Sequence, residues 1–205
     1  MSAELRSTTP PSTLRLIGFL AVALGAALVG VAATREWVTI GFTADVKHVA
    51  DVSVHGTDVW EGKALLLAAA ASLVLLLAMR IARSPLTRRA IAITIVVVGI
   101  GCTALAFVTA VRAPDRFGGT NAVDRLAETI ARQTGDAVDV VRAALEQTFN
   151  AEVRIDVGPS LWLAAAGGVV LAIGGALGVA WVREDDRSTE ADEPIAASEP
   201  AGPNP

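Results

Sequence analysis

Residues 161–182 read LWLAAAGGVVLAIGGALGVAWV and contain no charged side chain. A helix needs about 20 predominantly apolar residues to cross the hydrocarbon core of a bilayer. This stretch meets that requirement, and we predict a membrane-spanning helix over residues 160–182.

Further uncharged stretches occupy residues 16–33, 64–79 and 90–111. The middle one is slightly short, but Lys63 and Arg80 flank it, and their long side chains can reach the headgroups while their stems lie in hydrocarbon. We therefore predict an all-α membrane protein with a four-helix transmembrane bundle. The predicted spans are residues 14–34, 63–82, 90–111 and 160–182.

The first span has an alternative interpretation as a cleaved signal peptide. Arg6 and Arg15 precede its apolar part, and Gly30 and Ala32 near its end resemble a cleavage site. A signal-peptide core is usually about 7–15 residues long, which is shorter than this stretch and favours a permanent span.

Composition agrees with a membrane protein. Of the 205 residues, 53% are hydrophobic and 19% are charged, whereas soluble domains have roughly 45–50% and 25%. The net charge of −4 gives no support to nucleic-acid binding, which requires a clustered basic surface. Cys102 is the sole cysteine, so no disulfide can form within the chain.

The tight connector at residues 83–89, with the end of the span before it, is basic and has no acidic residue. Its arginines are Arg80, Arg83, Arg88 and Arg89. Positive charge beside a span favours the cytoplasmic side. We therefore expect a bacterial inner-membrane protein with both termini, residues 1–13 and 183–205, in the cytoplasm.

The C-terminal tail and the tryptophans carry further expectations. From Glu184 onward the chain is acidic and rich in Pro and Ser, which predicts a disordered tail. A tryptophan ring with its polar N–H favours the headgroup layer. The predicted interface anchors are Trp37, Trp60, Trp162 and Trp181.

The residue pattern of the loop 35–62 predicts two short strands outside the membrane. Val38, Ile40 and Phe42 alternate with other residues, and Val52 and Val54 do the same. Alternation with period two is typical of a strand with one buried face. The two strands are expected to form a hairpin.

The loop 112–159 has an irregular entry at Pro114, followed by a pattern that predicts two short helices and a strand. Asn121 and Asp136 are suitable N-caps, and apolar residues recur at helical spacing after each. Residues 152–157, EVRIDV, alternate strictly. Because a single strand leaves its backbone unpaired, we expect this strand to pair with the hairpin in a small extracytoplasmic sheet.

The predicted spans offer little chemistry. Their interiors have no ionisable residue, although transporters and proton relays need such residues. His48 and His55 are only a weak signal for a metal site, and no nucleophile–base pair or phosphate-binding glycine loop is visible. The sequence predicts a non-enzymatic protein without catalytic, cofactor-binding or metal-binding residues.

Small residues recur at every fourth position in two of the spans. They are Gly168 and Ala172 on one face of the last span, Gly174 and Gly178 on a neighbouring face, and Ala21 and Gly25 in the first span. Such residues let helix backbones approach closely in lipid. Since one face is sufficient for packing within the chain, the second is predicted to bind a partner subunit.

The segment AATREWVT at residues 32–39, a β-like loop, and GTDVW at residues 56–60 lead into a Leu/Ala-rich span. This layout resembles small four-span membrane proteins of actinobacteria, in particular the Trp-associated membrane protein family, over residues 14–110. The placement of strands also resembles claudin-like proteins, without their paired cysteines. Actinobacterial proteins of this shape include accessory subunits of Mce-type lipid importers, so the resemblance implies such a role.

These features favour an accessory or assembly subunit of a cell-envelope complex, in contact with the lipid bilayer and with other membrane subunits. Two alternatives stay open. The first is a transport or channel component with a polar cavity near Ser72, Thr94 and Thr103. The second is an envelope sensor that binds a ligand outside and signals through its tail.

Overall fold

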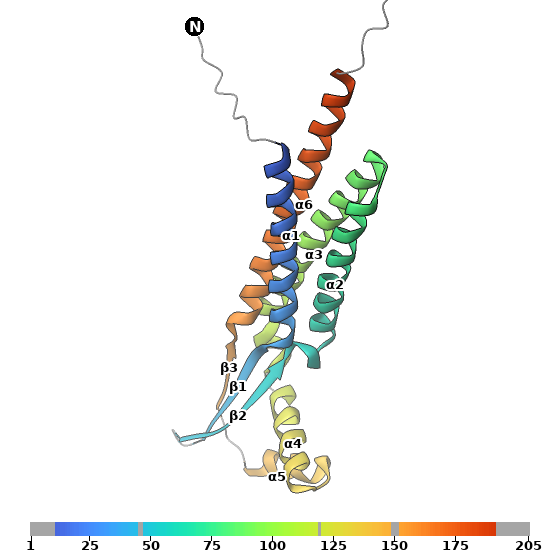
Figure 1. The fold of residues 1–205 in the computed structure, drawn as a ribbon. Coiled ribbons are helices and arrows are strands. Elements are labelled where there is room, and N and C mark those ends of the chain that lie inside the picture. The colour runs from blue at the N-terminus through green and yellow to red at the C-terminus, as the bar shows by residue number, and fades with distance from the viewer. Residues whose placement is uncertain (1–10, 45–46, 119, 149–151, 192–205) are drawn as a thin grey trace, which may run out of the picture.

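A computed structural model describes residues 11–44, 47–118, 120–148 and 152–191. Long helices form a bundle, and a small sheet with two short helices covers one end of it (Figure 1). The predicted class, a four-helix transmembrane bundle with a small sheet and two short helices, is confirmed.

The bundle helices are α1 (Pro11–Thr34), α2 (Trp60–Ile81), α3 (Pro85–Phe117) and α6 (Pro159–Ala191). Each contains a stretch long and apolar enough to cross a membrane. Large apolar side chains cover their outer surfaces; Leu67, for example, is 72% exposed. Soluble proteins rarely expose an apolar surface this extensive, so the bundle is a membrane-embedded domain.

Helix α6 packs closely against both α1 and α3. A methyl group added to Gly25 of α1 would lie 2.6 Å from the backbone nitrogen of Leu171. One added to Gly99 of α3 would lie 2.5 Å from the backbone nitrogen of Ala172. Only small residues permit this approach, and the resulting van der Waals contact replaces the hydrophobic driving force that lipid does not supply.

Two helices are longer than a bilayer is thick. Helices α3 and α6 each have 33 residues, which corresponds to about 50 Å, against a hydrocarbon core of roughly 30 Å. The end of α3 reaches the short helices, whereas α6 extends beyond the bundle at the opposite end (Figure 1).

The sheet contains β1 (Glu36–Ala44), β2 (Lys47–His55) and β3 (Glu152–Val157). β1 is central and pairs antiparallel with both neighbours. Ile40 lies opposite Val52 on one side and Ile155 on the other. The predicted hairpin and its pairing with the strand of the second loop are therefore confirmed.

The helices α4 (Thr120–Thr134), α5 (Val138–Thr148) and the short 3-10 helix η1 (Gly56–Asp58) complete the region that we call the cap, together with the sheet. Leu126 and Ala127 on the apolar side of α4 are buried. They belong to the same hydrophobic core as Ile40 of the sheet and Phe117 of α3. The cap and the adjoining end of the bundle therefore share one core.

The boundaries of α3 differ from the prediction. It begins at Pro85 rather than at residue 90, because the Ser84 hydroxyl accepts the backbone N–H of Thr87 and proline suits the first helical turn. The helix also continues through Pro114, since Ala113 and Phe117 are buried beside it and hold the last turn in the core. The connector to α2 shortens to residues 82–84.

Two further predictions need correction. Disorder from Glu184 is wrong for residues 184–191, because α6 continues to Ala191 without an intervening glycine or proline; residues 192–205 lie outside the described part. Asn121 does not cap α4, which begins at Thr120. Its side-chain amide instead donates to the carbonyl of Arg116, 3.0 Å away, at the end of α3.

Candidate functional site

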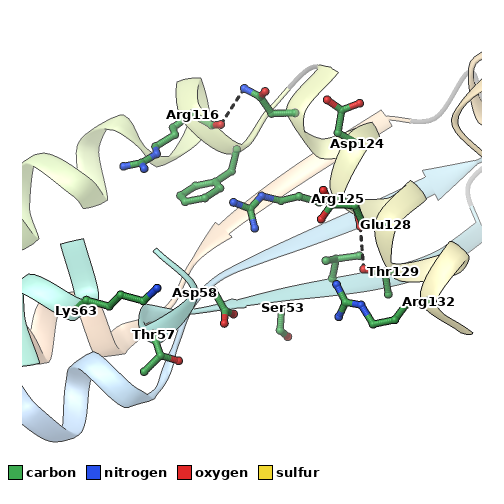
Figure 2. Close-up of a pocket in the computed structure, with 13 residues that line it drawn as sticks. Ser53, Thr57, Asp58, Lys63, Arg116, Asp124, Arg125, Glu128, Thr129 and Arg132 are labelled. Atoms are coloured by element: carbon green, nitrogen blue, oxygen red, sulfur yellow. Dashed lines mark hydrogen bonds between the residues drawn. The ribbon is translucent and has the colours of Figure 1, made fainter. Parts of the chain in front are cut away.

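A polar pocket with a volume of about 850 Å³ lies in the cap (Figure 2). Its walls come from β2, η1, the first turn of α2, the last turn of α3, and α4. Ligand-binding pockets usually have volumes of roughly 300–1,000 Å³. The pocket can therefore hold a small molecule or an extended segment of another protein.

The cations of this pocket are Lys63, Arg116, Arg125 and Arg132. Lys63 from α2 and Arg125 from α4 point toward each other across it (Figure 2). Among the described residues, Lys63, Arg125 and Arg132 form no ion pair.

The acidic residues of the pocket compensate this charge only in part. Asp124 lies 2.8 Å from Nε of Arg142, which lies outside the pocket. Asp58 accepts the backbone N–H of His55 at 3.1 Å. Glu128 is the remaining carboxylate of the lining. Positive charge is in excess, which favours a carboxylate or phosphate as the bound group.

The side chain of Arg116 is held on two sides. Its guanidinium carbon lies 5.7 Å from the centre of the Phe117 ring, and that of Arg125 lies 5.1 Å from the same ring. Arg116 also forms an ion pair with Glu61, whose side chain is 5% exposed. These contacts fix the cation before a ligand arrives, which lowers the ordering cost of binding.

Sequence patterns alone do not bring these residues together. Asp124 and Glu128 look like the solvated face of an amphipathic helix, and Lys63 looks like a residue flanking a span. The available signal is that Lys63 and Arg116 lie at the cap ends of α2 and α3, where charged side chains gather at the membrane surface.

The small residues predicted for packing and partner binding lie inside the bundle. A methyl group on Gly168 would lie 2.5 Å from Oγ1 of Thr103 in α3, and one on Gly174 would lie 2.7 Å from the backbone nitrogen of Val22 in α1. Gly178 is close to Ala92.

Ala172 and Gly25 are likewise at the contacts of α6 with α3 and α1, and Ala21 lies beside Gly174. Both small faces of α6 therefore contact this chain, because α6 has a close neighbour on each. The prediction that one face stays free for a partner is not supported at these positions.

The tryptophans occupy two different environments. Trp60 and Trp162 are 62% and 51% exposed at the cap end of the bundle, as an interface anchor requires. Trp37 is 1% exposed, and its indole N–H donates to the carbonyl of Ala32 at 2.8 Å. Trp181 is 7% exposed and lies under Arg15. Trp37 is thus a core residue rather than a surface anchor.

The arginines predicted to set the topology lie at the bundle end away from the cap, where α2 joins α3 (Figure 1). Arg80 stacks on Phe19, with its guanidinium carbon 5.1 Å from the ring centre. The Nε of Arg88 donates to the carbonyl of Ala82 at 2.9 Å. Arg83 and Arg89 are exposed.

The histidines show no common site in the described structure. The ring of His55 lies 3.8 Å from Asp58, whereas the side chain of His48 lies outside the described part. Within the described residues, no group of three or more His, Cys, Asp or Glu side chains could hold a metal ion.

The fold and the pocket define a four-span membrane protein with a ligand-sized basic pocket in a compact cap at one end. The chain belongs to the tryptophan-associated transmembrane protein family, whose sequence profile matches residues 19–200. The predicted resemblance to this family is confirmed, and the match includes the cap helices as well as the spans. No curated protein matches the chain.

Proposed function

We propose that the protein is a non-enzymatic accessory subunit of a larger cell-envelope complex, and that its cap binds an acidic segment of a partner subunit. The basic pocket carries this proposal. Lys63, Arg125 and Arg132 have no ion-pair partner among the described residues. Carboxylates of a partner would pair with them through charge-assisted hydrogen bonds.

The proposed orientation places the cap outside the cytoplasm and both termini inside, in a bacterial inner membrane. Its support is the group of arginines in and beside the α2–α3 connector, at the bundle end opposite the cap, since basic residues next to spans favour the cytoplasmic side. A lipid transporter of the Mce type is the complex that the actinobacterial resemblance suggests.

The packing at the arginine-rich end of the bundle favours a subunit over an independent channel. The gap between α1, α2, α3 and α6 at the arginine-rich end holds about 10 Å³, which is the lower limit for a single water. The hydroxyl of Thr103, considered above for a polar cavity, instead shares its one proton between the carbonyls of Gly99 at 3.0 Å and Ala165 at 3.3 Å.

An envelope sensor is the second candidate, and the connection between β3 and α6 favours it. Only Gly158 separates the strand from the helix, and the N–H of Gly158 donates to the carbonyl of Trp37 at 2.7 Å. A ligand that shifts the sheet would therefore move α6, which extends past the other end of the bundle (Figure 1).

Affinity purification of the tagged protein from native membranes in mild detergent tests the proposed subunit role. Replacing Arg125 and Arg132 with serine should reduce recovery of the partner at least about tenfold, because charge-assisted hydrogen bonds are lost. The matched control replaces Arg83 and Arg89 with serine at the opposite end and should retain the partner. Recovery of the wild type as a lone monomer, or equal recovery with the pocket variant, contradicts the proposal.

A further inference from the structure

A second cavity lies in a groove between α2 and α3 at the cap end of the bundle, beside the basic pocket, with which it shares Arg116. Its volume is about 350 Å³. The α3 residues that line it are Leu105, Val108, Thr109, Arg112, Asp115 and Arg116, and α2 contributes Trp60 and Glu61. Spacings of three and four residues place the α3 members on one helical face.

The groove changes character along its length. Leu105 and Val108 form its apolar part toward the middle of the bundle, and Arg112, Asp115 and Arg116 form its charged part toward the cap. Because this change runs from the middle of the bundle toward its cap end, it matches the order of acyl chain and headgroup in a phospholipid.

The charged part is electrically balanced. Glu61 forms an ion pair with Arg116. This leaves Arg112 and Asp115, for which the described residues supply no ion-pair partner. One cation and one anion on the same face complement a headgroup that carries both charges better than a purely anionic one.

Glu61 gives an independent indication of a ligand. The residue is 4% exposed, and its Oε2 has no hydrogen-bond donor among the described residues. An unsatisfied buried carboxylate oxygen is costly, so such a group in a cavity wall requires a partner. An ammonium group is a strong hydrogen-bond donor and could supply the hydrogen bond that Oε2 of Glu61 lacks.

We propose that this groove binds a phospholipid with a phosphoethanolamine headgroup. Arg112 and Arg116 hold the phosphate, because guanidinium groups bind phosphate through parallel N–H donors. Asp115 and the free oxygen of Glu61 accept the ammonium, and an acyl chain lies along Leu105 and Val108.

Native mass spectrometry of the full-length protein tests this inference, after transfer from mixed nanodiscs that contain phosphatidylethanolamine, phosphatidylcholine and phosphatidylglycerol. The wild type should retain phosphatidylethanolamine preferentially, because the choline headgroup has no N–H donor and the glycerol headgroup has no cation. Arg112→Gln and Asp115→Asn should each reduce this retention about tenfold. Both side chains are exposed, so the fold should persist.

Arg89→Gln, near the other end of α3, is the matched control and should retain the lipid. Soluble phosphoethanolamine at equal concentration should not displace it, since it lacks the acyl chain. The inference would be overturned if the wild type retained all three lipids equally or preferred phosphatidylglycerol. It would also be overturned if the soluble headgroup displaced the lipid, or if both variants retained phosphatidylethanolamine as well as the wild type does. The partner purification described above uses different residues, so the two proposals can fail independently.

Discussion

At the scale of single residues, the glycines of α3 illustrate how position decides the effect of one methyl group. A side chain at Gly99 would contact the backbone of α6 at 2.5 Å, whereas a side chain at Gly101 would meet nothing within 4 Å. The two glycines are neighbours on the same membrane helix, yet only one of them permits close helix contact.

We expect Gly99→Ala to lower the free energy of unfolding by about 1–3 kcal/mol, because overpacking forces the two backbones apart. Gly101→Ala is the matched control and should leave stability unchanged or slightly raised, since alanine favours the helix. Thermal unfolding of both variants in the same detergent measures the difference. Equal melting temperatures for the two would show that α3 and α6 do not approach as described.

At the scale of elements, Glu36 connects the two strands of the hairpin. Its carboxylate accepts the hydroxyl of Ser53 on β2 at 2.5 Å and that of Thr39 on β1 at 2.7 Å. These hydrogen bonds, that from Ser53 first, lower the pKa of Glu36 below its ordinary value of 4.5. The stabilisation is complete above the unfolded-state pKa and is lost as the pH falls from 4.5 through the folded-state pKa.

Replacing Ser53 with alanine should therefore raise the pKa of Glu36, which a carboxyl-carbon NMR titration measures. The cap of this variant should also unfold at a higher pH during acid titration than the wild-type cap. Thr129→Ala is a suitable control, because that hydroxyl donates to Arg125 within α4. A Glu36 titration unaffected by loss of the Ser53 hydroxyl would be inconsistent with the described pairing.

Elements with strong local patterns were predictable, and those defined by distant contacts were not. Alternation at Val38, Ile40 and Phe42 identifies a strand, and the need to pair residues 152–157 identifies its neighbour. The continuation of α3 through Pro114 depends on burial of Phe117 in the cap, which no local pattern shows.

The same limit applies to the sites. Spacing identifies the small faces of α6 but not the helices that cover them, and the pocket combines Lys63 with Arg125 from distant parts of the chain. Glu61 looks like an ordinary helix-start carboxylate until its burial is known.

At the scale of the whole molecule, the single cysteine makes the proposed orientation directly measurable. Cys102 is 3% exposed within α3, so the native protein should resist a membrane-impermeant thiol reagent. Glu146 in α5 and Arg83 in the connector are exposed positions at opposite ends.

In intact cells, Glu146→Cys should react with the reagent, and Arg83→Cys should react only after permeabilisation. The native protein is the control for both variants. The reverse pattern would invert the proposed orientation. Reaction of both cysteines from the same side would contradict the placement of the cap and the α2–α3 connector on opposite sides of the membrane.

The very short connections between the spans and the cap also limit how far the cap can lie from the membrane. Only Arg35 separates α1 from β1, and only Val59 separates η1 from α2. Since α1 and α2 nearly match the bilayer thickness, at about 36 and 33 Å, we expect them to hold the basic pocket close to the membrane surface. The proposed acidic segment of a partner would then bind at that height, and we expect a thicker bilayer to submerge the pocket entrance progressively.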